Sequence, residues 1–147
     1  MILVPQNASQ EQVLRIVLEW VEVLAKEDYR AVYSALGYAL AFGEPGDECI
    51  RAEIKKYRSP EYYPGIVDFR VTDWRTAIGG NPSPKKKVIW YKANSTGLAG
   101  AVAFDLPLNG KWSDLTADFV FCEHDDETYV LGLEDIGSMA QRQRESD

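Results

Sequence analysis

The amino-acid sequence predicts an α+β fold in which N-terminal helices pack on a curved, mainly antiparallel sheet of four to five strands, in a cone-like arrangement. Two observations support this prediction. Apolar residues recur every three or four positions over residues 9–57, and they alternate with polar residues from residue 66 onward. Turn sequences separate the alternating stretches closely enough for hairpins, which join antiparallel neighbours. Helices followed by hairpin-linked strands are typical of the α+β class.

The helical part is expected to cover about residues 9–57. Its first helix should begin after Ser9, because Ser9 and Gln12 form an S-x-x-Q capping box. An apolar stripe with helical spacing follows. The members of this stripe are Val13, Ile16, Val17, Trp20, Val21 and Leu24. Asp28 and Asp47 are positioned to cap a second helix and a short third helix.

The sheet part is expected to cover about residues 66–136, where apolar and polar residues alternate. The predicted strands are residues 66–72, 88–91, 98–106, 115–121 and 128–136. Asn109-Gly110 is a strong type I′ turn signal and predicts a hairpin. The polar tail, residues 140–147, is expected to fray. Because no repeat or linker interrupts the pattern, residues 1–147 are expected to form a single domain.

The charge balance of the chain restricts its partners. The 147 residues include 16 Lys plus Arg and 23 Asp plus Glu, which gives a net charge of −7. This balance argues against nucleic acid or an anionic membrane as partner, because both favour basic faces. Residues 1–4 are too short for a signal peptide. The two cysteines, Cys49 and Cys122, are expected to be free thiols in the cytoplasm.

Two segments resemble the superfamily of ketosteroid isomerase and nuclear transport factor two. Residues 20–29, W-V-E-V-L-A-K-E-D-Y, are similar to the end of the first helix of that family and its turn into the second. Residues 118–121, a polar turn and residues 129–133 are similar to its terminal hairpin. The resemblance covers most of the chain in outline. It implies a cone of helices on a curved sheet, small ligands in the mouth of the cone, and a homodimer through the sheet.

A second resemblance points to a different function. Residues 106–116, L-P-L-N-G-K-W-S-D-L-T, are similar to a motif of uncharacterised bacterial proteins, some of which are suspected toxin-immunity factors. This resemblance implies that the chain binds a protein.

Only part of the isomerase's catalytic set is present. That chemistry uses a carboxylate base together with a tyrosine and a protonated aspartic acid. The resemblance places Trp20 where the tyrosine would stand and Ala117 where the acid belongs, with Asp118 one residue away and so on the other face of the strand. Glu44 falls near the position of the base, in a Gly/Pro turn where acidic residues are normally solvated. The sequence therefore favours a non-catalytic protein.

Large aromatic residues are the main candidates for a ligand pocket, although most of them are expected in the core. The pocket candidates are Trp20, Tyr33, Trp90, Phe104, Phe119 and Asp118. A second candidate site is a recognition edge at Trp112, Ser113 and Asp114, which combine a ring with two hydrogen-bonding groups. The alternative for this edge is a Ser- or Asx-type turn that fixes the start of a strand.

Two charged segments complete the set of candidates. Residues 122–127, C-E-H-D-D-E, do not let four ligands converge, so an exposed hairpin tip is expected there and no metal site. No motif implies a cofactor. The basic run Lys85-Lys86-Lys87 is expected to be a solvated edge that discourages aggregation. The alternative is a landing point for a phosphate or an acidic partner.

Three functions are compatible with these observations. The favoured one is a non-catalytic binding protein of immunity type, whose acidic surface engages a basic protein. An unknown small molecule is the other ligand considered. The alternatives are a small-molecule isomerase or dehydratase that uses the cone cavity, and a plain dimerisation module.

Overall fold

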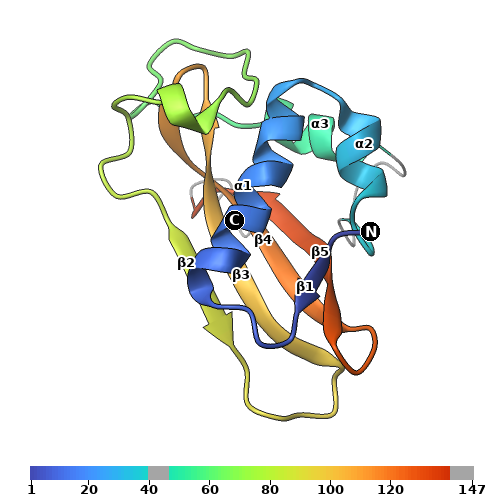
Figure 1. Cartoon of the computed structure of the whole chain (residues 1–147). Helices are drawn as coiled ribbons and strands as arrows, with labels where there is room; N and C mark the ends of the chain where they lie inside the picture. Colours follow the sequence, from blue (N-terminus) through green and yellow to red (C-terminus); the bar gives the residue numbers. More distant parts are fainter. Residues whose placement is uncertain (40–46, 140–147) are drawn as a thin grey trace.

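The fold brings helices from the first half of the chain onto a sheet from the second half (Figure 1). The computed structural model describes residues 1–39 and 47–139. Within these residues the helices are α1 (Gln10–Ala25), α2 (Tyr29–Ser34) and α3 (Glu48–Lys55), with a short 3₁₀ turn, η1 (Trp74–Thr76). The strands are β1 (Leu3–Pro5), β2 (Lys86–Trp90), β3 (Leu98–Leu108), β4 (Lys111–Glu123) and β5 (Thr128–Gly137). The strongly curled sheet forms a half-barrel, which confirms the predicted α+β class and its cone-like arrangement.

The helices begin where capping residues predict them. The Ser9 hydroxyl accepts a hydrogen bond from the Gln12 amide, and the Gln12 side chain accepts one from the Ser9 amide. This capping box caps the N-terminus of α1. The Asp28 carboxylate accepts from the Ala31 amide and caps α2. Asp47 stands at the N-cap of α3 but makes no capping hydrogen bond with its side chain, contrary to expectation.

The sheet has the strand order β1-β5-β4-β3-β2, and every neighbouring pair is antiparallel. The predicted hairpin between β3 and β4 is confirmed. Asn109 has a φ of 51° and Gly110 a φ of 80°, and a type I′ turn requires two such positive values. Leu3–Pro5 forms an edge strand that the sequence does not predict, because three residues are too few to show an alternating pattern.

The predicted strand over residues 66–72 is wrong. Only Val71 makes a bridge, an isolated antiparallel one to Leu108. Val67 is 65% exposed, whereas Phe69 and Val71 are almost fully buried, so the segment inserts two side chains into the core. Its backbone bonds to the end of β3, where the Thr72 amide donates to the Pro107 carbonyl and the Asn109 amide to the Arg70 carbonyl, but it forms no continuous strand. The sheet therefore begins at β2 in this half of the chain, not at residue 66, and it gains β1 instead.

Aromatic rings dominate the core between the helices and the inner face of the sheet. Trp20 meets Phe119 edge to face, with ring centroids 5.1 Å apart. Tyr57, Tyr63 and Phe69 form a second cluster in which the rings meet edge to face at 5.0 to 5.9 Å. These orientations match the quadrupoles of the rings and add to the stabilisation that burial provides.

Candidate functional site

Three rings form a row at the open end of the sheet. Trp90, at the end of β2, is 41% exposed and stacks on Phe121 of β4, with centroids 4.9 Å apart and an interplanar angle of 23°. Tyr129 of β5 lies 6.4 Å from Phe121 and 6.1 Å from Trp90. We call Trp90, Phe121 and Tyr129 the aromatic row. It presents an exposed indole that is already held in place by a buried ring.

A glycine between the rings makes this stacking possible. In the register of the sheet, Gly100 of β3 stands between Trp90 and Phe121. A Cβ atom at this position would lie 2.4 Å from the Ile89 carbonyl oxygen and 3.0 Å from Cδ2 of Phe121. Any larger residue would therefore push the rings and strands apart, and the absence of a side chain lets Trp90 reach across β3.

The turn between β4 and β5 carries exposed carboxylates next to this row. Asp125 organises the turn, because its carboxylate accepts from the amide of Glu127 at 2.8 Å and from the amide and hydroxyl of Thr128 at 2.7 and 2.9 Å. These hydrogen bonds, the one from Glu127 foremost, lower the pKa of the Asp125 carboxyl. Glu123 and Asp126 are exposed, as the sequence predicts for this hairpin tip. We call residues 123–127 the acidic tip.

The aromatic row and the acidic tip form one surface. Gln6 ties the chain before α1 to the tip, since its side chain donates to the Asp125 carbonyl and its amide to that of Glu127, both at 2.9 Å. A hollow of about 500 Å³ lies there, and Tyr129 lines it together with Gln6 and residues 123–126. Tyr129 thus belongs to both features. Within residues 1–39 and 47–139 no three His, Cys, Asp or Glu side chains group in a way that could hold a metal ion.

Three of the predicted pocket residues lie inside the core. Phe104 and Phe119 have no exposed surface, and Trp20 is 2% exposed. The Trp20 indole N–H donates to the Val32 carbonyl at 3.1 Å, so its polar group is satisfied within the molecule. Trp20 also lines a small, mainly apolar hollow of about 240 Å³ between α1, α2 and the start of the chain.

The other pocket candidates lie elsewhere. Tyr33 is half-buried on α2. Asp118 lies on the outer face of β4, where the register pairs it with Asp135 of β5. Trp90 stands at the open end of the sheet, and Glu44 lies outside the described residues. The structure therefore does not bring the six candidates together, and their role in binding a ligand stays a prediction.

The predicted recognition edge makes its hydrogen bonds within the molecule. The Ser113 hydroxyl donates to the Leu106 carbonyl at 2.6 Å and accepts from the Leu115 amide at 3.0 Å. Asp114 accepts from the Tyr57 hydroxyl, and burial raises the pKa of that phenol. Trp112 is half-buried. These contacts favour the alternative interpretation, a turn that fixes the start of β4.

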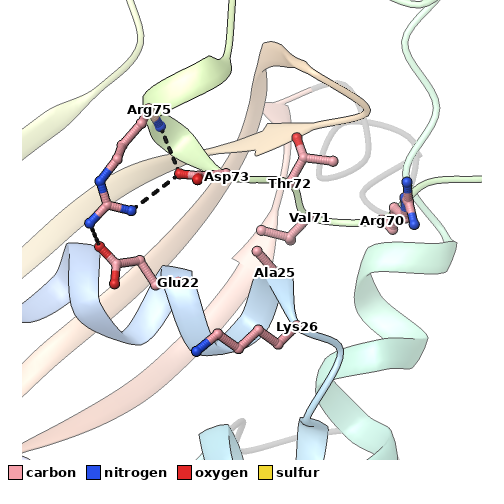
Figure 2. A pocket seen from close by; sticks show the side chains of 8 residues that line it. All are labelled: Glu22, Ala25, Lys26, Arg70, Val71, Thr72, Asp73 and Arg75. Carbon is pink, nitrogen blue, oxygen red and sulfur yellow. Dashed lines mark hydrogen bonds and ion pairs between the residues drawn. The ribbon is translucent and has the colours of Figure 1, made fainter.

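A charged groove separates the end of α1 from the segment before β2 (Figure 2). Its volume is about 530 Å³, and none of its lining residues is a site that the sequence predicts. The Arg75 guanidinium contacts the Glu22 carboxylate and lies 3.4 Å from the Asp73 carboxylate. Figure 2 shows these three side chains pointing toward one another, with Arg70 on the far side of the groove. The Arg75 guanidinium thus bridges the two carboxylates.

The sequence gives one signal for this groove. Asp73 caps η1 by accepting from the Arg75 amide at 3.0 Å, a local Asx pattern that a reader of the sequence could have marked. The ion pair with Glu22 joins residues 53 positions apart, which no local pattern reveals.

Both cysteines are free thiols, as predicted. Cys49 is buried on α3, and Cys122 is half-buried on β4. Burial raises the pKa of each thiol, so at neutral pH both are mostly protonated and weakly nucleophilic.

Comparison with known proteins gives no match: no family model fits the chain, and no curated protein or solved structure is significantly similar to it. Among the residues that the structure describes, no helix combines the length and the apolar character needed to cross a membrane.

Proposed function

We propose that this chain is a non-catalytic binding protein that recognises a basic protein partner through the aromatic row and the acidic tip. The observation that supports this proposal most is the exposed Trp90 indole, which is stacked on Phe121 and lies beside a hollow rimmed by carboxylates. Large, pre-positioned rings are the side chains that most often dominate binding energy at protein interfaces.

The two parts of this surface have complementary tasks. The carboxylates of Glu123 and Asp126 attract a basic partner and speed its approach. Once the partner is in contact, the faces of Trp90 and Tyr129 accept Lys or Arg side chains through cation–π interactions. Little ordering is needed on binding, because Asp125 already fixes the turn and Phe121 already holds Trp90.

The enzyme alternative has weaker support. An isomerase or dehydratase of the nuclear-transport-factor-two-like superfamily needs a base in an open cavity, and the one candidate for a base is Glu44. In the described part of the chain, Phe104 and Phe119 occupy the interior without exposed surface. We also propose that the chain belongs to the nuclear-transport-factor-two-like superfamily and is located in the cytoplasm.

A homodimer through the outer face of the sheet is also proposed. Small and apolar side chains lie on that face, including Ile89 and Ala101, and the Tyr38 ring covers Gly132 at its far side. We expect Ile89→Lys to dissociate such a dimer in sedimentation experiments. A chain that sediments as a monomer at every concentration would remove this part of the proposal.

The main experiment compares two charge reversals that change net charge equally. The variant Glu123→Lys/Asp126→Lys alters the acidic tip, and Glu19→Lys/Glu61→Lys alters exposed carboxylates elsewhere. Each variant is immobilised and used to capture proteins from a lysate of the organism that encodes the chain. We expect one basic protein to be retained by the wild type and by the second variant, released by salt, and lost with the first.

Two outcomes would overturn the proposal. One is equal retention by both variants, because the acidic tip would then play no part in binding. The other is a captured protein without a basic surface. If the wild type instead turns over a small molecule and Glu44→Gln abolishes the turnover, the enzyme alternative replaces the binding function.

A further inference from the structure

Strand β2 is an edge of the sheet and has unpaired backbone groups. It pairs with β3 on one side only, and Figure 1 shows no strand beyond it. The Asp105 amide donates to the Lys85 carbonyl, and the Tyr91 amide donates to the Ala99 carbonyl, both at 2.9 Å. Hydrogen-bonding residues alternate along an antiparallel strand, so the odd-numbered residues of β2 bond to β3. The amides and carbonyls of Lys86, Val88 and Trp90 therefore point away from the sheet.

The start of this edge is held rigidly. Asp105 is 1% exposed, and its carboxylate accepts from the Lys85 amide at 2.7 Å and from the Thr116 hydroxyl at 2.7 Å. The Asn81 side chain donates to the same carboxylate at 3.2 Å. Strand β2 thus enters the sheet from a fixed point, and its outward amides and carbonyls are already spaced as in a strand.

Positive charge accumulates along the same edge. Lys85, Lys86 and Lys87 are all exposed, and within the described part of the chain no carboxylate forms an ion pair with them. The Lys86 ammonium lies 4.3 Å from the centre of the Trp112 ring, which holds that side chain beside the strand. This cluster is local, because the whole chain has a net charge of −7.

We propose that the β2 edge binds an acidic segment of a partner protein in extended conformation, which adds to the sheet as a further strand. Main-chain hydrogen bonds to Lys86, Val88 and Trp90 would give affinity, and Asp or Glu side chains opposite Lys85 and Lys87 would give specificity. A second copy of β2 fits the edge less well, since it would bring three more lysines to the same place. This surface meets the aromatic row at Trp90, but it lies apart from the acidic tip and takes a ligand of opposite charge.

The first test uses two short peptides as probes, one that alternates Glu with Val and one that alternates Lys with Val. We expect the Glu peptide to bind and the Lys peptide not to bind. In amide hydrogen exchange, the Glu peptide should slow exchange at Lys86, Val88 and Trp90. The amides of Lys87 and Ile89, which already bond to β3, should change little.

Two variants separate backbone pairing from packing and charge. Val88→Pro removes an outward amide without removing a bond to β3, and Val88→Ala truncates the same side chain but keeps the amide. We expect Val88→Pro to bind the Glu peptide about 2- to 13-fold more weakly than Val88→Ala, which corresponds to one hydrogen bond. Lys85→Glu/Lys87→Glu should reverse the preference between the two peptides, so that the Lys peptide binds and the Glu peptide does not.

Several outcomes would overturn the proposal. These are equal binding of both peptides by the wild type, binding of neither, or protection of amides outside β2. Equal affinity of the two Val88 variants would exclude strand addition. A dimer that Val88→Pro dissociates would show that a second copy occupies the edge instead. If Val88→Pro does not fold, the exchange pattern and the lysine variant still decide the question.

Discussion

Two Trp–Phe pairs lie on the inner face of the sheet, one in the interior, where the rings meet edge to face, and one at the open end, where they stack. Trp20 packs on Phe119, and Trp90 packs on Phe121, two residues further along the same face of β4. Trp20 is 2% exposed and its N–H is bonded to Val32, whereas Trp90 is 41% exposed. Ring content alone therefore does not identify a binding site. The interior pair is enclosed in the core, whereas the outer pair leaves the Trp90 indole partly exposed.

The largest effect is expected from truncating the interior ring. Trp20→Ala removes a buried indole and leaves a cavity, so we expect the free energy of unfolding to fall by about 3–5 kcal/mol. Trp90→Ala removes a ring that is 41% exposed and should cost less than half as much. Urea unfolding of both variants measures the difference. Equal losses would mean that Trp90 contributes to the core as much as Trp20 does.

A smaller effect is expected from filling the space between the outer rings. Gly100→Ala places a Cβ atom 2.4 Å from the Ile89 carbonyl oxygen and 3.0 Å from the Phe121 ring, and such overpacking costs about 1–3 kcal/mol. It should also separate Trp90 from Phe121 and change the tryptophan fluorescence.

The control for this prediction is Ala101→Gly, on the neighbouring residue and the opposite face of β3. It should cost about 0.5–1 kcal/mol through backbone entropy and leave the fluorescence unchanged. A Gly100→Ala variant with wild-type stability and fluorescence would contradict the role of this glycine.

The smallest effect concerns the turn that carries the acidic tip. Hydrogen bonds lower the pKa of Asp125 in the folded chain, so its stabilising contribution is fully present above its unfolded pKa of about 3.9. The contribution is lost as the pH falls through the lowered pKa. Asp125→Asn should therefore lower the melting temperature at pH 7, and the difference from the wild type should shrink toward pH 2. A difference that is independent of pH would show that the charge of Asp125 contributes nothing.

The sequence predicts the parts of the fold that local patterns determine. The capping box at Ser9, the cap at Asp28 and the Asn109-Gly110 turn each act within about four residues, and all three are confirmed. Segment 66–72 shows the limit of such patterns. Its alternation is real, since Phe69 and Val71 are buried, but whether an extended segment joins a sheet depends on partners elsewhere in the chain.

The candidate site was less predictable than the fold. The acidic tip is contiguous in the sequence, which predicts that it is exposed, and residues 123–127 are exposed. The aromatic row joins Trp90, Phe121 and Tyr129 from three strands, and its geometry depends on the register that sets Gly100 between two of them. The register of the strands depends on contacts between residues far apart in the chain, which no local sequence pattern reveals. The same holds for the ion pair of Glu22 with Arg75.

The most direct test of the proposed surface is photo-crosslinking in cells of the organism that encodes the chain, with a photoreactive phenylalanine analogue placed at position 124 or at position 78. His124 lines the hollow at the acidic tip. Ile78 is 81% exposed, but its amide donates to the Gly110 carbonyl in the turn between β3 and β4, away from the aromatic row. We expect position 124 to crosslink to one basic protein and position 78 not to crosslink to it. Crosslinking of the same protein from both positions, or none from position 124, would contradict the proposed surface.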